Sequence, residues 1–194
     1  SDKLKQLEGI FEGGESGLGA AINDMLNSFS DVASAPTDLT ARTVVLTRLD
    51  ETAARFRATS QRLDDLQLAS SQEIEQKVNA ANNLSQSIAE VNAEIARTQG
   101  QGQPPNDLLD RRDQLVRELN QYVQTSSIMA DDGTMSIFVA GSQALVLGTN
   151  ANAMAVVKND YGDPWSNQLV INRDGVSTAL NEHTMGGGEI SGLL

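Results

Sequence analysis

The longest stretch of this sequence without a helix breaker runs from Thr37 to Gln99 and contains neither proline nor glycine. Within it, seam positions at heptad spacing stay in phase from residue 46 to residue 98. One line of the seam holds Leu46, Ala53, Ser60, Gln67, Ile74, Ala81, Ile88 and Ile95, and the other holds Leu49, Phe56, Leu63, Ser70, Lys77, Leu84, Val91 and Thr98. With Thr37 as N-cap, a continuous helix of about 60 residues would measure about 90 Å. The pattern predicts a rod rather than a globule.

The middle of this seam is polar, at Ser60, Gln67, Ser70 and Lys77. The packing partner must therefore change or be lost halfway along, or the helix must break or bend there. Both readings stay open at this point. We expect coiled-coil-like packing within one chain, because a zipper between chains would require a cleaner seam.

Shorter helices are predicted on both sides of the long one. Residues 18–34 carry an amphipathic stripe that ends before Pro36, and residues 1–17 hold at most a helical turn around residues 4–10. After the breaker-rich loop 100–105, Asn106 caps a helix over 106–123, which we expect to pack antiparallel on the second half of the long helix. Acid-before-base pairs at i, i+4 should support it, namely Asp107 with Arg111 and Asp113 with Arg117.

From about residue 126 the apolar period changes from helical to two. Strands are expected around 128, 135–139 and 144–147 as a three-stranded meander, followed by 154–157, 168–172 and 176–180 in the same sheet. The predicted fold class is α+β, with a long coiled-coil-like helical bundle or rod followed by a small antiparallel β-rich subdomain. The expected domains are a helical region 1–124, a β-rich subdomain 125–182, and a glycine-rich linker 183–194 leading into a further helix.

The composition excludes several functional classes. Fourteen Lys and Arg against 26 Asp and Glu give a net charge of −12, which disfavours binding to nucleic acid or to an anionic membrane. With no cysteine in 194 residues there is no disulfide, thiolate nucleophile or cysteine-ligated metal. Aromatic residues at 4% leave little for an aromatic-lined ligand pocket. The chain shows no membrane span or signal peptide, and its opening at Ser1 without Met suggests an internal fragment.

The candidate chemical motifs are weak. His183, the only histidine, follows Glu182 but has no nucleophile motif or second histidine for a triad or metal site. The pair Asp131 and Asp132 precedes Gly133, and Asp-Gly is ordinary hairpin-turn chemistry. We therefore expect His183 on the surface and the aspartates in a turn.

Three further segments contain polar or glycine-rich patterns that occur in binding sites. Residues 159–163 could offer oxygen ligands to calcium but lack EF-hand spacing, and residues 13–19 resemble a phosphate loop without the preceding strand or the Gly-Lys-Ser/Thr end. The charged run 110–113 is typical of a solvated helix face. No catalytic residue, cofactor or metal site is predicted.

Four stretches in order along the chain resemble the bacterial flagellar hook-associated protein 1 family. These are residues 27–42, residues 103–119 with their Pro-Asn-Asp-Leu-Leu-Asp-x-Arg-Asp-x-Leu pattern, the start of the meander at 131–148, and the closing stretch 187–194. Ser191 stands where the family usually has glycine, and little is recognised within 149–180. The resemblance spans most of residues 18–194.

The resemblance implies a non-enzymatic structural subunit at the hook–filament junction, secreted by the flagellar type III export apparatus and needed for filament attachment and motility. The implied partners are the hook protein, the second junction protein and sister subunits, with an export chaperone binding a C-terminal segment that this fragment lacks. The fragment itself is expected to be a monomer. The alternatives are a coiled-coil interaction module, cytosolic or extracellular, and a small ligand- or calcium-binding β module on a helical stalk.

Overall fold

The computed structural model describes residues 2–11, 14, 17–99, 106–158 and 167–193. The chain forms two compact units, Ser1–Ser70 and Ser71–Leu194. This grouping differs from a division by type of secondary structure, because the last helix and part of the long one belong to the same unit as the strands.

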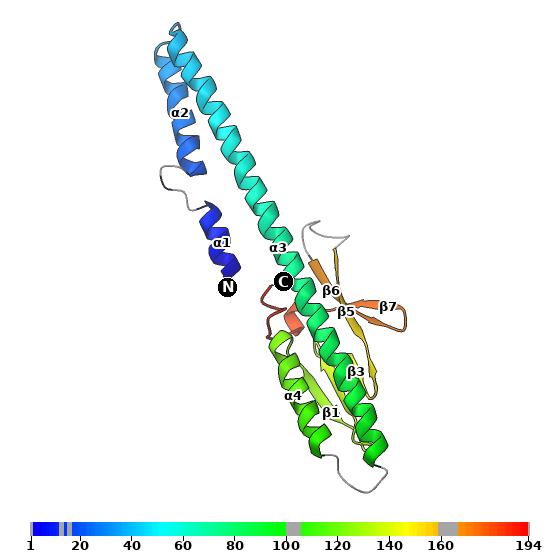
Figure 1. Ribbon diagram of the computed structural model, residues 1–194. Helices are drawn as coiled ribbons and strands as arrows, with labels where there is room; N and C mark the ends of the chain where they lie inside the picture. The colour runs from blue at the N-terminus through cyan, green and yellow to red at the C-terminus, as the bar shows by residue number, and fades with distance from the viewer. Residues whose placement is uncertain (1, 12–13, 15–16, 100–105, 159–166, 194) are drawn as a thin grey trace. The chain divides into compact units, whose positions relative to one another are not determined.

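The first unit consists of α1 (Asp2–Phe11), α2 (Leu18–Ser34) and the N-terminal part of α3 (Leu39–Gln99). Figure 1 shows α2 beside α3, joined by a short turn. Arg42 on α3 donates two hydrogen bonds to the carbonyl of Pro36 in this turn, at 2.6 and 2.9 Å. At most one helical turn was predicted around residues 4–10, whereas the helix α1 extends over Asp2–Phe11.

The capping residue of α3 differs from the prediction. The carboxylate of Asp38 accepts a hydrogen bond from the backbone N–H of Thr40 at 2.8 Å, so Asp38 is the N-cap and Thr37 is not. The helix begins at Leu39, and the residue directly before it is the one whose side chain reaches the first free N–H groups.

The buried contacts of the first unit lie one position away from the predicted seam. The buried positions here are Ala21 and Ser28 on α2 and Val45 and Thr52 on α3, all of them small or β-branched. Thr52 donates its hydroxyl to the carbonyl of Ala21 at 3.1 Å, which ties the two helices together. In contrast, the predicted seam residues Leu46, Leu49 and Phe56 are exposed. The prediction of a buried seam was wrong for this half of the helix, because α2 packs on the neighbouring face.

The second unit contains the rest of α3 and α4 (Asn106–Tyr122), which run antiparallel side by side in Figure 1. The α3 helix is continuous through residues 60–77, so no break occurs there. Ile74, Ala81, Ile88 and Ile95 are all buried, so this half of the predicted seam is confirmed. The polar middle of the seam coincides with the boundary between the units at Ser70.

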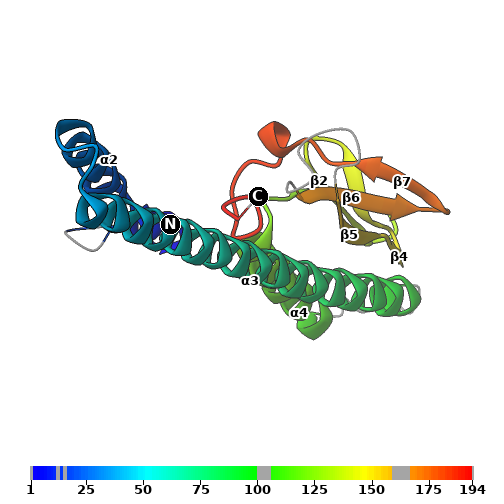
Figure 2. The ribbon, with the colours of Figure 1, turned by 90° about the horizontal axis from the view of Figure 1, so that it is seen from above.

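The strands of the second unit form two antiparallel sheets instead of the single predicted sheet. The first has the order β1-β2-β3-β4, with β1 (Ser126–Met129), β2 (Met135–Val139), β3 (Gln143–Leu147) and the unpredicted β4 (Asn150–Ala151). The second has the order β5-β6-β7, with β5 (Ala153–Lys158), β6 (Asn167–Arg173) and β7 (Val176–Ala179). Figure 2 shows the strands on one side of α3. The predicted α+β class with antiparallel strands is confirmed.

One apolar core joins α3, α4 and both sheets. Its fully buried members include Ile88, Leu119, Ile137 and Leu169. After β7 the chain forms a 3-10 turn, η1 (Glu182–Thr184), and then a series of turns that reach Leu193. Where a further helix was expected to start, the described residues up to Leu193 form turns.

Candidate functional site

Asn92 on α3 is a polar side chain of the second unit that is fully buried. Its amide nitrogen donates to the carbonyls of Met135 and Gly148, both at 2.7 Å. Its amide oxygen accepts the backbone N–H of Met135 at 3.1 Å. The carboxamide thus satisfies main-chain groups at the start of β2 and in the turn after β3, and it fixes the first sheet to the helix.

Arg112 on α4 lies next to this amide and is only 2% exposed. Its guanidinium donates to the carbonyl of Gly133 at 2.7 Å, to the Asn92 amide oxygen at 3.4 Å and to the sulfur of Met129 at 3.5 Å. Burial lowers the pKa of this guanidinium below its ordinary value, and its Nε atom has no hydrogen-bond partner.

The burial of Arg112 corrects the prediction that the charged run 110–113 is simply solvated. On a helix with 3.6 residues per turn, position 112 falls in line with the apolar residues Leu108, Leu115 and Leu119. That spacing was the available signal. The guanidinium supplies the hydrogen bonds that the β1–β2 turn needs, so its role is structural.

The second sheet has an equivalent anchor, ten residues earlier on α3. Asn82 accepts the backbone N–H of Met154 and donates to its carbonyl, both at 2.8 Å. Met154 lies in β5, an edge strand of that sheet, and the side chain of Asn82 therefore pairs with the strand as a neighbouring strand would. Sequence reasoning passed over Asn82 and Asn92 because an asparagine in a long helix carries no periodic signal.

The structure places the predicted chemical candidates apart from one another. His183 is exposed, as expected. Asp131 and Asp132 lie in the turn between β1 and β2, where the Asp132 carboxylate accepts the backbone N–H of Thr134 at 2.9 Å and its hydroxyl at 2.7 Å. These hydrogen bonds lower the pKa of Asp132. The described residues contain no group of three or more acidic or histidine side chains that could hold a metal ion.

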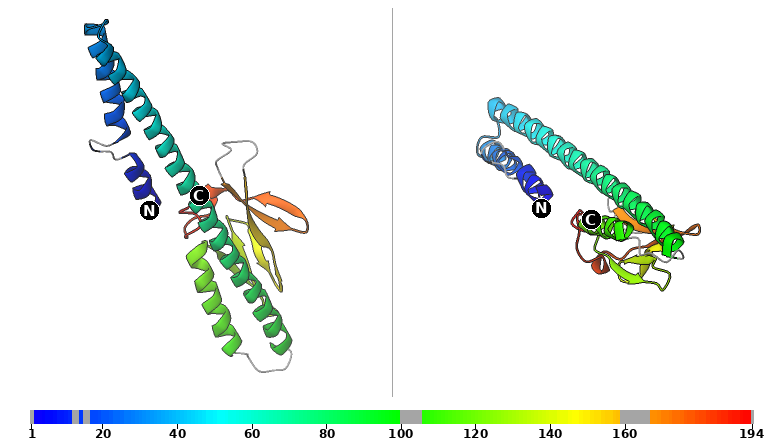
Figure 3. Two further views of the ribbon diagram at one scale, coloured as in Figure 1. Left: turned by 45° about the horizontal axis from the view of Figure 1, so that its top comes forward. Right: turned by 60° about the horizontal axis from the view of Figure 1, so that its bottom comes forward.

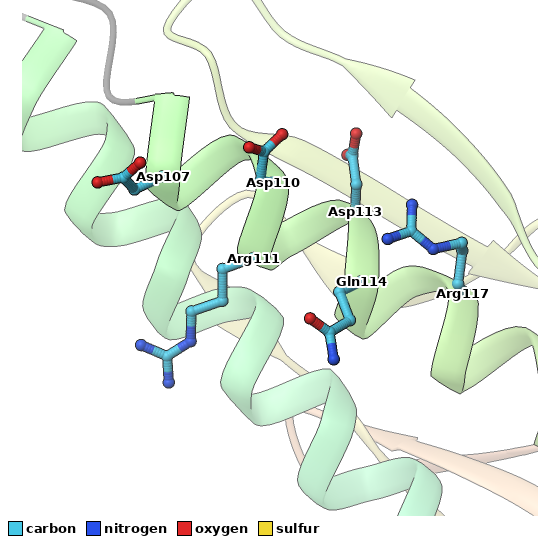
Figure 4. A pocket seen from close by; sticks show the side chains of 6 residues that line it. All are labelled: Asp107, Asp110, Arg111, Asp113, Gln114 and Arg117. Atoms are coloured by element: carbon cyan, nitrogen blue, oxygen red, sulfur yellow. The ribbon is translucent and has the colours of Figure 1, made fainter.

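The exposed side of α4 carries a shallow hollow of about 450 Å³, lined by charged residues around Asp110 and Arg111. Figure 4 shows the carboxylates of Asp110 and Asp113 on one side of the helix and Arg111 on the other. Neither predicted pair, Asp107 with Arg111 or Asp113 with Arg117, is among the salt bridges of the described residues.

A second hollow of about 360 Å³ lies at β3, β6 and β7 and includes Arg173 and Asp174. It contains no pairing of a nucleophile with a base. The candidate calcium loop 159–163 lies outside the described residues, as does part of the glycine-rich segment 13–19. Of that segment, Gly17 is the N-cap of α2. Among the described helices, none is both long and apolar enough to cross a membrane.

The first unit exposes an unusual number of large apolar side chains. They are Leu4, Leu7, Phe11, Leu26, Phe29, Leu39, Val44, Leu46, Leu49, Phe56 and Leu68. Contiguous groups of exposed apolar side chains mark contact surfaces more often than chemical sites. Among the described residues, the buried polar side chains belong to the scaffold, and these exposed apolar side chains are candidates for contacts with other molecules.

Comparison with known families gives this architecture a context. The model of the flagellar hook-associated protein FlgK helical domain matches residues 4–194. The chain belongs to this FlgK family. The resemblance found in the four sequence stretches is thereby confirmed.

Named relatives of the FlgK family match most or all of the chain. Flagellar hook-associated protein 1 of Escherichia coli is 30% identical, and the match covers 100% of this chain and 36% of that protein. The same protein of Salmonella typhimurium is 27% identical, with 100% and 35% covered. That of Bacillus subtilis is 28% identical over 75% of this chain. The chain thus spans about a third of the length of the curated relatives that it matches in full.

A solved structure agrees with these matches. The flagellar hook junction protein FlgK from Burkholderia pseudomallei is 25% identical with a TM-score of 0.87, and the match covers 99% of this chain and 35% of that one. The FlgK-like fold therefore extends over both the helical and the β-rich parts of the sequence.

Proposed function

We propose that this chain is the helical-domain portion of a structural subunit of the bacterial flagellum, which acts as an adaptor at the hook–filament junction. The observation that carries the proposal is the family match over residues 4–194 together with structural likeness to a hook junction protein over 99% of the chain. The relatives that cover the chain in full are named hook-associated proteins, which agrees with this role.

The physical character of the chain supports a building block over an enzyme. The half-buried Asn82 and the buried Asn92 and Arg112 serve main-chain groups of the scaffold. The exposed apolar side chains of the first unit favour a role in assembly, because exposed apolar patches are typical of protein contact surfaces. We infer that the protein has no catalytic activity and needs no cofactor.

The proposed location is outside the cell, at the junction between hook and filament, after export through the flagellar type III apparatus. The absence of cysteine is compatible with export in an unfolded state, since no disulfide has to form afterwards. The proposed partners are the hook protein, the second junction protein and sister subunits, with an export chaperone that binds a segment outside this chain. Nucleic acid and membranes are not proposed as partners.

Deletion of the gene in the bacterium that carries it tests the proposal. We expect hooks without attached filaments, filament protein released into the medium and loss of swimming, all restored by the intact gene. Electron microscopy of purified hook–basal bodies is the direct readout. Deletion strains that still carry filaments attached to their hooks would show the assignment to be wrong.

The oligomeric state of the 194-residue chain separates this proposal from a coiled-coil dimerisation module. We expect a monomer in sedimentation velocity over a hundredfold range of concentration. A dimer whose formation is lost in Leu46→Ser and Phe56→Ser would favour the zipper instead. Calorimetric titration with calcium addresses the remaining alternative, and we expect no heat of binding and no shift of the melting temperature.

A further inference from the structure

The last described residues, Met185 to Leu193, form a segment that we call the C-terminal strap. It lies at the C-terminal end of α4 in both views of Figure 3. The backbone N–H groups of Glu189 and Ile190 donate to the carbonyls of Gln121 and Tyr122, at 2.9 and 3.0 Å. These carbonyls belong to the last turn of α4, which has no intrahelical partners for them. A segment more than sixty residues away along the chain thus caps this helix.

The close approach of the strap to α4 requires glycine at position 188. Gly188 has a φ of +116°, and a Cβ atom there would lie 2.6 Å from the carbonyl oxygen of Tyr122 and 2.8 Å from the Cα of Val123. Both obstacles are backbone atoms, so no side-chain rotation could relieve the clash. The glycine-rich sequence at 186–188 is therefore a docking requirement and not merely a flexible linker.

The strap also completes the core of the second unit. Met185 and Ile190 are buried, and both belong to the apolar cluster that includes Ile74 and Leu119. Lys77 on α3 forms an ion pair with Glu189 at 2.5 Å, across 112 residues of sequence. Lys77 occupies a polar position of the heptad seam and also pairs with Glu73 on its own helix at 3.8 Å, so the strap supplies the shorter of its two ion pairs. The strap is thus tied to α4 by its main chain and to α3 by a side chain.

We propose that the C-terminal strap is a folding latch. The second unit reaches its native packing only when the strap has closed on the end of α4, because closure caps the helix, fills the core and adds Glu189 as an ion-pair partner of Lys77. A chain delivered N-terminus first therefore holds its α3–α4 hairpin and both sheets in an incompletely packed state until residue 190 is present. This inference concerns folding and does not depend on the proposed function.

Hydrogen exchange of the 194-residue chain, resolved by mass spectrometry, tests the latch through Gly188→Val. Because the strap makes the whole unit cooperative, we expect exchange to accelerate about tenfold or more not only in 185–193 but also at 74–81 on α3 and at 115–123 on α4. Complete loss of protection in the second unit is the extreme form of the same result.

Two glycine variants serve as matched controls. Gly192→Ala adds a methyl group within the strap, where the nearest atoms are 3.7 and 3.8 Å away. Gly175→Ala imposes the same kind of backbone strain, at a φ of +82°, with no atom within 4 Å. We expect both to leave exchange at 74–81 and 115–123 unchanged. If Gly188→Val accelerates exchange in 185–193 alone, or if Gly175→Ala has the same remote effect, the latch is refuted.

Pulse labelling during refolding of the unsubstituted chain tests the order of events. The latch predicts that amides at 74–81 and 115–123 gain full protection at the same rate as amides in the strap. Full protection of α3 and α4 well before the strap becomes protected would overturn the proposal, because the strap would then be a passive tail.

Discussion

The two units contain parts of the same helix with the same heptad phase, yet they bury their apolar residues very differently. Of the twenty-two buried apolar side chains among the described residues, only Ala21 and Val45 lie in 1–70. Of the sixteen large apolar side chains that are exposed, eleven lie there. A heptad pattern therefore predicts which face of a helix can be buried. Whether that face is buried depends on the elements that the rest of the chain packs against it.

The difference arises from what each unit offers as a partner for α3. In the first unit, Thr52 on α3 bonds to Ala21 on α2, and the buried positions of these helices carry small or β-branched side chains that cover little surface. In the second, α4, two sheets and the C-terminal strap surround a shared core. We therefore expect substitutions to have large effects on the second unit and small effects on the first.

The largest expected difference comes from truncating core residues. Leu119→Ala in the second unit should lower the free energy of unfolding by about 3 kcal/mol, because it removes transfer energy and leaves a cavity. Leu46→Ala in the first unit, where the side chain is 67% exposed, should change it by less than about 0.5 kcal/mol. Urea titration followed by circular dichroism measures both, with hydrogen exchange assigning the loss to a unit. Equal losses would refute the contrast.

The next largest effect concerns the carboxamide that anchors the first sheet. Asn92→Ala should cost about 2 kcal/mol, because it leaves a buried N–H and two carbonyls without partners. The matched control is Asn83→Ala on the exposed side of the same helix, which should be neutral or slightly stabilising. A loss no larger than that of the control would mean that water replaces the amide.

The ion pair of the strap should have a smaller, pH-dependent effect. The hydrogen bond from the Lys77 ammonium to Glu189 raises the pKa of Lys77 above 10.5. Because the folded pKa is the higher one, the stabilisation is fully present below pH 10.5 and is lost as pH rises through the raised value. Glu189→Gln should cost about 0.5 kcal/mol at neutral pH, and the difference from the unsubstituted chain should vanish at higher pH. A difference that persists there would point to packing instead of charge.

The smallest effect is expected for the surface pair Arg48 and Glu51 of the first unit, 2.8 Å apart with both side chains nearly half exposed. Glu51→Gln should change stability by no more than about 0.3 kcal/mol, because solvent screens the pair. Thermal melts at 20 mM and 500 mM salt provide the measurement. A loss of stability as large as that of Glu189→Gln would contradict the expectation that ion pairs contribute less in the first unit than in the second.

The helices and most strands could be predicted because their signals are local. The apolar period marks α2, α3, α4 and the meander to within a few residues, and the breakers at 36 and 100–105 mark their ends. The division of the strands into two sheets could not be predicted in this way, because pairing depends on contacts distant in sequence. The choice between Thr37 and Asp38 as cap failed for a local reason, since both are good capping residues.

The polar anchors were harder to predict than the helices and strands. Arg112 could have been found from its place in an apolar stripe, but the same residue is also part of a charged run, which favoured the solvated reading. Asn82 and Asn92 had no such signal, because their partners are backbone groups of strands that begin up to 71 residues later.

The two asparagine anchors have a consequence for how insertions and deletions are tolerated. Asn82 hydrogen-bonds to the backbone N–H and C=O of Met154, and Asn92 does the same for Met135. Each sheet is therefore fixed in position relative to α3 by one residue. Adding one residue immediately before either methionine must break these hydrogen bonds or shift the strand by one residue. Such a shift would move the buried side chains of the strand to the solvent face. The two asparagines thus fix the positions of both sheets along α3. We expect insertions and deletions to be tolerated only where they leave these hydrogen bonds in place.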